Sequence, residues 1–336
     1  MSTHLITGGA GFIGSHLTES LLRQGHRVLV LDDLSSGSVE NLAHLRSNPQ
    51  LEFFPESVFS KNLLAELVDR ADVVFHLAAT VGVFNIIDSP VNTIMNNIGG
   101  TETVLKLAAK KKKKVLVTST SEVYGKTVAV PFHEDGDLVL GPSSKSRWSY
   151  AASKLVDEFL ALAYWRELHV PTVVVRLFNT IGPRQIGRYG MVVPRFLRQA
   201  MNGVNLTVYG SGRQTRCFTY VSDVVTWLIL LANEDKAVGQ VFNAGNPEEV
   251  SIGELARRVI GLTRAEVDID YIPYEKAYEQ GFEDMERRVP DISKISALTG
   301  YRPTVDLASA LRRTHDWLAN NEKQPTLTPL HAYTAG

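Results

Sequence analysis

The sequence predicts an α/β protein built on a doubly wound parallel sheet, with a smaller, interleaved C-terminal lobe. Short apolar runs alternate with amphipathic segments through the first half of the chain, a pattern typical of repeated strand–helix units. A glycine-rich turn, Gly8-Gly9-Ala10-Gly11-Phe12-Ile13-Gly14, separates the first apolar run from the first amphipathic segment, as in Rossmann-type folds. With 336 residues, 44% of them hydrophobic, the chain can bury a full-sized core.

The elements follow from hydrophobic periodicity taken in chain order. Strands are expected at residues 3–7, 27–31, 51–54, 73–76, 114–118 and 171–176. Helices are expected at residues 12–23, 61–68, 91–110, 148–169 and 193–201. Because ligands of such sheets bind at the carboxyl ends of the strands, the residues that follow each strand are candidates for a binding site.

The first strand–turn–helix unit predicts a dinucleotide site. Gly8, Gly11 and Gly14 permit a tight turn and close approach of a pyrophosphate to the backbone, and the helix that begins near Phe12 offers free N–H groups to it. Asp32 ends the second strand, where a carboxylate accepts hydrogen bonds from ribose hydroxyls and repels a 2′-phosphate. The expected cofactor is therefore NAD rather than NADP.

Composition excludes several classes of function. The formal net charge is −1, from 35 Lys and Arg against 36 Asp and Glu, so nucleic acid and anionic membranes are not expected partners. A single cysteine, Cys217, forms no intrachain disulfide, and no apolar segment reaches the roughly 20 residues needed to span a bilayer. Nine histidines show no zinc-ligand spacing, so no metal is expected. A cytoplasmic enzyme is the prediction.

Tyr150 and Lys154 form a candidate catalytic pair. Four residues are about one helical turn, so the phenol and the ammonium project from the same helix face. Tyrosine has a reference pKa of about 10, and a neighbouring cation lowers the pKa of a phenol. We therefore expect Lys154 to lower the pKa of Tyr150 and Tyr150 to act as a general base.

Three stretches together carry a family resemblance: the glycine-rich turn, Ser149-Tyr150-Ala151-Ala152-Ser153-Lys154, and Thr118-Ser119-Thr120-Ser121-Glu122-Val123-Tyr124-Gly125. From about residue 5 to about residue 318 the chain resembles the extended short-chain dehydrogenase/reductases, in particular their nucleotide-sugar epimerases, dehydratases and decarboxylases. The resemblance implies tightly held NAD, a nucleotide-sugar substrate that is UDP-linked, and a homodimer formed through the helices expected at 91–110 and 148–169.

The resemblance also implies roles for individual residues. The implied catalytic residues are Thr120, Glu122, Tyr150 and Lys154. The implied cofactor-binding residues are Gly8, Gly11, Phe12, Ile13, Gly14, Asp32, Leu77, Ala78, Ala79, Asn97, Thr118, Tyr150 and Lys154, with Asn97 also supporting the sheet and the active-site helix. The implied substrate-binding residues are Ser121, Glu122, Asn179, Tyr209, Arg216 and Arg288.

In the implied reaction Tyr150 removes the sugar C4 hydroxyl proton while hydride passes to NAD, and the resulting 4-ketone has three possible fates. Dehydration is disfavoured, because Ser121 occupies the position of the dehydratases' acidic residue. Ser121-Glu122, together with Arg147-Trp148, looks like the UDP-glucuronate decarboxylases, which form UDP-xylose or a UDP-4-keto-pentose. A UDP-sugar 4-epimerase, acting on UDP-glucose, UDP-glucuronate or UDP-N-acetylglucosamine, stays open.

A protein of another class, a non-catalytic dinucleotide-binding sensor or scaffold, is the remaining alternative. The intact Thr120, Tyr150 and Lys154 argue against it. For the domains, we expect residues 1–178 to form the NAD-binding part, with parts of about 215–245 returning to it. Residues 179–322 would form mainly the substrate lobe, and residues 323–336 a flexible tail.

Overall fold

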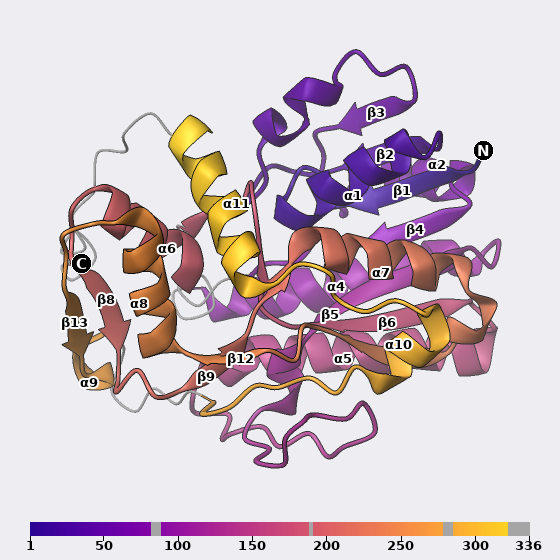
Figure 1. Cartoon of the computed structure of the whole chain (residues 1–336). Coiled ribbons are helices and arrows are strands. Elements are labelled where there is room, and N and C mark those ends of the chain that lie inside the picture. Colours follow the sequence, from indigo (N-terminus) through magenta and orange to yellow (C-terminus); the bar gives the residue numbers. More distant parts are fainter. Residues whose placement is uncertain (82–88, 188–190, 278–284, 322–336) are drawn as a thin grey trace.

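The computed structural model describes residues 1–81, 89–187, 191–277 and 285–321 (Figure 1). The tail expected at 323–336 lies outside these residues. Within the described part of the chain, no helix combines the length and the apolar character that crossing a bilayer requires.

A seven-stranded sheet with strand order β11-β6-β5-β4-β1-β2-β3 forms the centre of the molecule, and every strand pair in it is parallel. The strands are β1 (Thr3–Thr7), β2 (Arg27–Leu31), β3 (Leu51–Phe54), β4 (Val73–His76), β5 (Lys114–Thr120), β6 (Thr172–Leu177) and β11 (Gln240–Ala244). The order reverses between β1 and β4, as in a doubly wound fold. The predicted fold class is confirmed.

Helices cover both faces of this sheet, which explains why its strands are almost continuously apolar. On one face lie α2 (Lys61–Arg70), α4 (Pro90–Ala109) and α5 (Trp148–Leu168); on the other lie α1 (Phe12–Arg23) and α7 (Val221–Asn233). Successive side chains of a strand enter different cores: Leu5 packs with α2 and α4, and Ile6 packs with α1 and α7.

Two features of the sheet depart from the predicted elements. The seventh strand, β11, pairs with β6 in the register Phe242 to Val175, after α7 has crossed the sheet face. In addition, β5 continues to Thr120, two residues beyond its expected end. Thr120 therefore stands at the carboxyl edge of the sheet, and its hydroxyl accepts a hydrogen bond from the Glu122 amide at the start of η2 (Ser121–Tyr124).

The remaining elements gather mainly beside the carboxyl edge of the sheet, where Figure 1 shows α6, α8, α9, β8 and β13 grouped together. Three two-stranded sheets pair β7 (Thr180–Ile181) with β10 (Thr219–Tyr220), β9 (Thr215–Cys217) with β12 (Glu249–Ser251), and β8 (Leu206–Tyr209) with β13 (Ile269–Ile272). The helices are α6 (Val192–Met201), α8 (Ile252–Thr263), α9 (Tyr274–Ala277), α10 (Ser293–Thr299) and α11 (Leu307–Asn321), with short 3-10 turns η1 (Val39–Leu45) and η4 (Asp235–Ala237).

Candidate functional site

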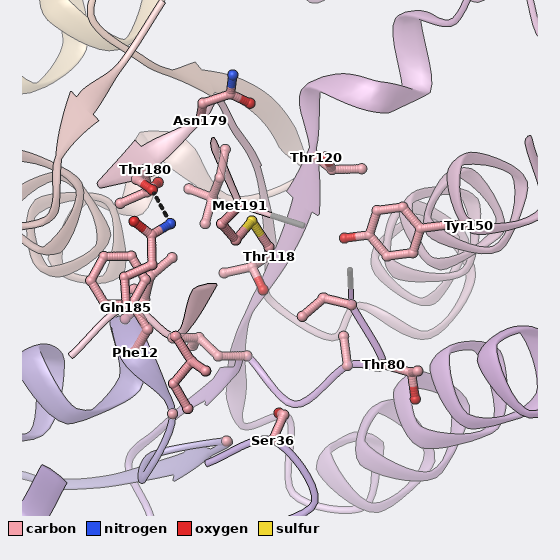
Figure 2. Close-up of a pocket in the computed structure, with 18 of the residues that line it drawn as sticks. Phe12, Ser36, Thr80, Thr118, Thr120, Tyr150, Asn179, Thr180, Gln185 and Met191 are labelled. Atoms are coloured by element: carbon pink, nitrogen blue, oxygen red, sulfur yellow. Dashed lines mark hydrogen bonds between the residues drawn. The ribbon is translucent and has the colours of Figure 1, made fainter. Parts of the chain in front are cut away.

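A cavity of about 570 Å³ lies between the carboxyl edge of the sheet and the smaller elements. Its walls include the residues that directly follow β1, β2, β4, β5 and β6. All of the residues predicted to form the site line this cavity except Asn97. Folding thus brings together the predicted catalytic, cofactor and substrate residues, which are widely spaced along the chain (Figure 2).

The glycine turn at the start of α1 is too tight for side chains. A Cβ at Gly14 would lie 2.1 Å from the Gly8 carbonyl oxygen, and one at Gly8, where φ is +74°, would lie 2.8 Å from the Ala78 nitrogen. No side chain caps the amino end of α1. The first-turn N–H groups are therefore available to an anion, and this backbone cradle fits a dinucleotide pyrophosphate.

Asp32 is fixed beside that turn. Its carboxylate accepts hydrogen bonds from the backbone N–H groups of Ala10 and Leu34, each at 2.9 Å. Burial raises the pKa of the Asp32 carboxyl above its ordinary value, and these backbone hydrogen bonds act in the opposite direction. The side chain lines the cavity at the end of β2, a position that fits contact with ribose hydroxyls.

Tyr150 extends from α5 into the cavity with Thr120 beside it (Figure 2). Burial raises the pKa of the Tyr150 phenol, and the Glu122 carboxylate raises it further. A hydrogen bond with the Thr120 hydroxyl lowers the pKa of the phenol. Thr120 and Tyr150 together present two hydroxyl groups to one region of the cavity.

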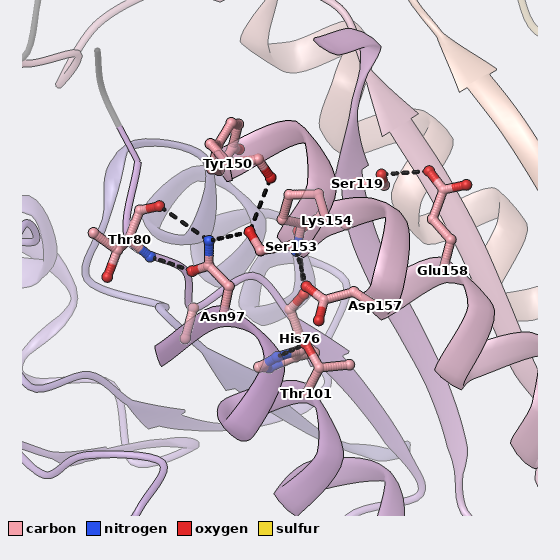
Figure 3. Close-up of polar contacts among 12 residues, drawn as sticks. His76, Thr80, Asn97, Thr101, Ser119, Tyr150, Ser153, Lys154, Asp157 and Glu158 are labelled. Atoms are coloured by element: carbon pink, nitrogen blue, oxygen red, sulfur yellow. Dashed lines mark hydrogen bonds and ion pairs between the residues drawn. The ribbon is translucent and has the colours of Figure 1, made fainter. Parts of the chain in front are cut away.

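Lys154 differs from its expected arrangement. The sequence predicts that its ammonium lowers the pKa of Tyr150, but Lys154 Nζ lies 2.7 Å from the carboxylate Oδ2 of Asp157. Asp157 itself raises the pKa of Tyr150. The pKa of the phenol is therefore raised, chiefly by burial and then by the Glu122 and Asp157 carboxylates, while the Lys154 ammonium lies in an ion pair with Asp157 (Figure 3).

Asn97 is the one predicted cofactor residue that does not line the cavity, and its contact with NAD stays a prediction. Its side chain is buried on α4, where the amide Oδ1 accepts a hydrogen bond from the Thr80 amide at 2.8 Å. Its Nδ2 donates to Ser153 Oγ at 3.1 Å (Figure 3). Asn97 therefore links the loop after β4 to α5 and supports the helix that carries Tyr150.

Glu122 lies between two buried arginines. Arg147 Nη1 is 3.3 Å from one Glu122 carboxylate oxygen, and Arg288 Nη1 is 3.7 Å from the other. Arg288 Nη1 also lies 3.3 Å from the Asn179 side-chain oxygen. Two guanidinium groups face one carboxylate, so this end of the cavity has a local excess of positive charge that suits an anionic ligand.

Further along the cavity lie the residues predicted for the nucleotide end. Arg216 is buried and donates from Nη1 to the carbonyl oxygens of Thr215 and Met285, at 2.7 and 2.8 Å. The guanidinium of Arg195 lies 4.4 Å from the ring centre of Tyr209. An arginine stacked on a tyrosine and a buried arginine are suited to a phosphate-bearing ligand.

Several lining residues were not among the predicted site residues: Thr80, Arg147, Gln185, Met191, Arg195, Gln214 and Tyr274. For Arg147 the sequence gives an indication, since it stands three residues before Tyr150, directly ahead of α5, but sequence alone does not show that it faces Glu122. Among the described residues, no group of three or more His, Cys, Asp or Glu side chains could hold a metal ion.

The chain is similar to known proteins over nearly its whole length. The chain is 44% identical over 319 residues to a UDP-N-acetyl-alpha-D-glucosaminuronate decarboxylase of Bacillus cytotoxicus, covering 95% of this chain and 98% of that protein. It is 36% identical to UDP-glucuronic acid decarboxylase 1 of Xenopus tropicalis, covering 97% of this chain and 76% of that protein.

Solved structures show the same architecture. A UDP-glucuronic acid 4-epimerase from Bacillus cereus, solved in complex with UDP-glucuronic acid and NAD, superposes with a TM-score of 0.85 at 30% identity and covers 95% of this chain and 99% of that one. The family model described as GDP-mannose 4,6 dehydratase matches residues 5–314. The resemblance deduced from the three motifs is thereby confirmed, and the chain belongs to the GDP-mannose 4,6 dehydratase family of extended short-chain dehydrogenase/reductases.

Proposed function

We propose that this protein is an NAD-dependent decarboxylase of a UDP-linked hexuronic acid. The observation that carries the proposal is the placement of Glu122 between the buried Arg147 and Arg288, beside Tyr150. Two arginines provide a binding place for a sugar carboxylate close to the general base. The decarboxylase names of relatives that are 44% and 36% identical over nearly the whole chain support the same reaction.

When bound in the glycine cradle, NAD supplies the hydride acceptor for oxidation of the sugar at C4. The residues of the chain perform the accompanying proton transfer. Tyr150 takes the C4 hydroxyl proton, and Thr120 holds the same oxygen by a hydrogen bond. Oxidation at C4 makes the sugar a β-keto acid.

Loss of carbon dioxide then requires little further catalysis. The C5–C6 bond breaks and its electron pair moves into the C4 carbonyl, giving an enolate at the oxygen that Thr120 and Tyr150 hold. Arg147 and Arg288 orient the sugar carboxylate before the bond breaks, and Glu122 positions the water that afterwards returns a proton to C5 of the enolate, giving the 4-keto-pentose. The pocket therefore needs no acid for a leaving hydroxyl, consistent with a serine at position 121.

Product analysis tests this function. Purified protein with added NAD is incubated separately with UDP-glucuronic acid, UDP-N-acetylglucosaminuronic acid and UDP-glucose. The masses of the products are measured by mass spectrometry. A product lighter by carbon dioxide from one of the uronic acids is the expected result. No change in any of the substrates would contradict the proposal.

A UDP-sugar 4-epimerase is the second candidate, supported by the 30% identity to the Bacillus cereus UDP-glucuronic acid 4-epimerase. That reaction shares the C4 oxidation and differs only in return of hydride to the opposite face of the ketone. The same incubations distinguish it, because an epimerase yields a product of unchanged mass with altered chromatographic mobility.

Glu122→Gln is expected to lower kcat for carbon dioxide release by about 10- to 100-fold, the lower part of the range for a group that assists proton transfer. The KM for the uronic acid should not rise, because the carboxylate that competes for Arg147 and Arg288 is removed. Released carbon dioxide and NAD affinity are measured in parallel. Unchanged decarboxylation would remove Glu122 from the mechanism, and the epimerase alternative predicts little effect.

We also propose a homodimer formed through α4 and α5, which pack side by side on one sheet face. Their outer surface exposes Val91, Met95 and Phe159 at 71, 64 and 65%, an apolar patch suited to a second copy of the chain. Light scattering is expected to give twice the 37.1 kDa chain mass for the wild type and a single chain for Phe159→Glu. Val128→Glu, at an exposed position off these helices, is the control; a monomeric wild type contradicts the proposal.

A cytoplasmic location is likewise proposed. The only cysteine of the chain, Cys217, is buried and free, which suits a reducing compartment. Fractionation of the producing cell with an antibody to the protein tests it.

A further inference from the structure

A fully buried ion pair lies one turn from the catalytic tyrosine. The side chains of Lys154 and Asp157 are 3% and 0% exposed, and Lys154 Nζ is 2.7 Å from Asp157 Oδ2 (Figure 3). Placing a carboxylate in such a position is costly for stability, because a buried charge loses its hydration.

Of the residues that the structure describes, His76 and Thr101 lie beside the pair, and neither carries a charge. The His76 ring lies between the hydroxyls of Thr7 and Thr101, at 2.8 and 3.1 Å. Burial and the Lys154 ammonium lower the pKa of His76 to about 3, so the ring is neutral. On the α4 side, Thr101 offers Asp157 only a hydroxyl.

The neighbouring carboxylate on α5, Glu158, is directed elsewhere. It forms a buried ion pair with Arg176 of β6 at 2.8 Å. Its charge is therefore compensated by Arg176, although burial, first, and the Glu158 charge, to a smaller extent, raise the pKa of Asp157. Asp157 is thus the carboxylate that pairs with the lysine of the Tyr150-Lys154 motif.

The electrostatics of Tyr150 depend on this arrangement. Burial, Glu122 and Asp157 raise the pKa of the phenol, in that order. The Thr120 hydroxyl and Arg288 act in the opposite direction. A positive charge on Lys154 can favour the phenolate only to the extent that Asp157 does not compensate it.

We propose that Asp157 is a positioning residue that holds the Lys154 ammonium and, through its negative charge, sets the pH range in which Tyr150 can act as a base. The inference rests on the proposed function, in which Tyr150 takes the C4 hydroxyl proton. It assigns the buried carboxylate a part in catalysis that acts through Lys154 and Tyr150, without contact with the substrate. A purely structural ion pair would instead affect stability alone.

The test compares Asp157→Asn and Asp157→Ser, both of which remove the charge, with the wild type. Activity that needs the phenolate rises with pH through the pKa of Tyr150. Removing a nearby negative charge lowers that pKa, so the acid limb of the kcat/KM profile is expected to move to lower pH by about one unit. Having two variants keeps the test valid if one of them fails to fold, as checked by circular dichroism.

The matched control is Glu66→Gln, the same change of charge at an exposed position of α2 rather than of α4 or α5. Solvent screens that site, so its acid limb should coincide with the wild type. The proposal is overturned if the acid limb of the folded Asp157 variants moves no further than that of the control. A lower midpoint of thermal unfolding in these variants would then indicate a structural role alone.

A second measurement separates this inference from the proposed function. Tyrosine labelled with ¹³C at Cζ is followed by NMR without substrate, and the Tyr150 resonance is identified by its loss in Tyr150→Phe. In the Asp157 variants this resonance is expected to begin its titration at lower pH than in the wild type; an unchanged onset contradicts the inference. Failure to find turnover with any nucleotide sugar would contradict the proposed function alone.

Discussion

Replacing Tyr150 by phenylalanine is expected to lower kcat by about 10²- to 10⁴-fold, the contribution of a positioned general base. The change removes one oxygen and leaves the ring in place on α5, so the cavity keeps its shape. Affinity for NAD should be retained, because the glycine turn and Asp32 are untouched. Turnover of the uronic acid and equilibrium NAD binding are the two measurements.

Tyr164→Phe is the matched control for that change. Tyr164 lies on the same helix but is partly buried against the core on the α5 face of the sheet and does not line the cavity. Its variant should turn over substrate at the wild-type rate. If Tyr150→Phe also retains most of its activity, the tyrosine mechanism is wrong.

Gly14→Ala is expected to disrupt the cofactor site through the backbone. The new Cβ would lie 2.1 Å from the Gly8 carbonyl oxygen and 2.7 Å from the Gly9 Cα, and backbone atoms cannot rotate away as a side-chain tip can. We expect the free energy of unfolding to fall by about 3 kcal/mol, the upper part of the usual range for overpacking. An equal loss of binding energy corresponds to about 100-fold weaker NAD binding.

Two other glycine substitutions serve as comparisons. The stability of each variant is measured by denaturant unfolding and its NAD affinity by titration. Gly261→Ala, inside α8 with no atom within 4 Å of the added carbon, should stabilise the protein by up to about 1 kcal/mol, because alanine favours a helix. A Cβ at Gly11 would lie 3.2 Å from the Gly8 carbonyl oxygen, so the fold can accept alanine there with a small shift. The added methyl group would still stand in the cradle, so NAD binding should weaken more than the fold does. Wild-type stability and NAD affinity in Gly14→Ala would contradict the proposed cradle.

The sequence alone determined those features of this protein that depend only on residues close together in the chain. Apolar runs of strand length at residues 3–7, 27–31 and 73–76 became β1, β2 and β4 without change of bounds. The glycine spacing after β1 predicted a turn that excludes side chains, and the four-residue spacing of Tyr150 and Lys154 placed them on one helix. Periodicity and turn geometry are local properties of the backbone, so they can be deduced from the order of residues.

Only the tertiary structure decided how the charges are paired. Arg147 and Arg288 lie far apart in the sequence and meet at Glu122, and Asp157 compensates the charge that Lys154 was expected to direct at Tyr150. For Asn97, the implied support of the active-site helix takes the form of a hydrogen bond to Ser153 of α5, a partner that only the folded chain defines. The strength and sign of these effects depend on distances and burial across elements far apart in the chain, and no local pattern of residues specifies them.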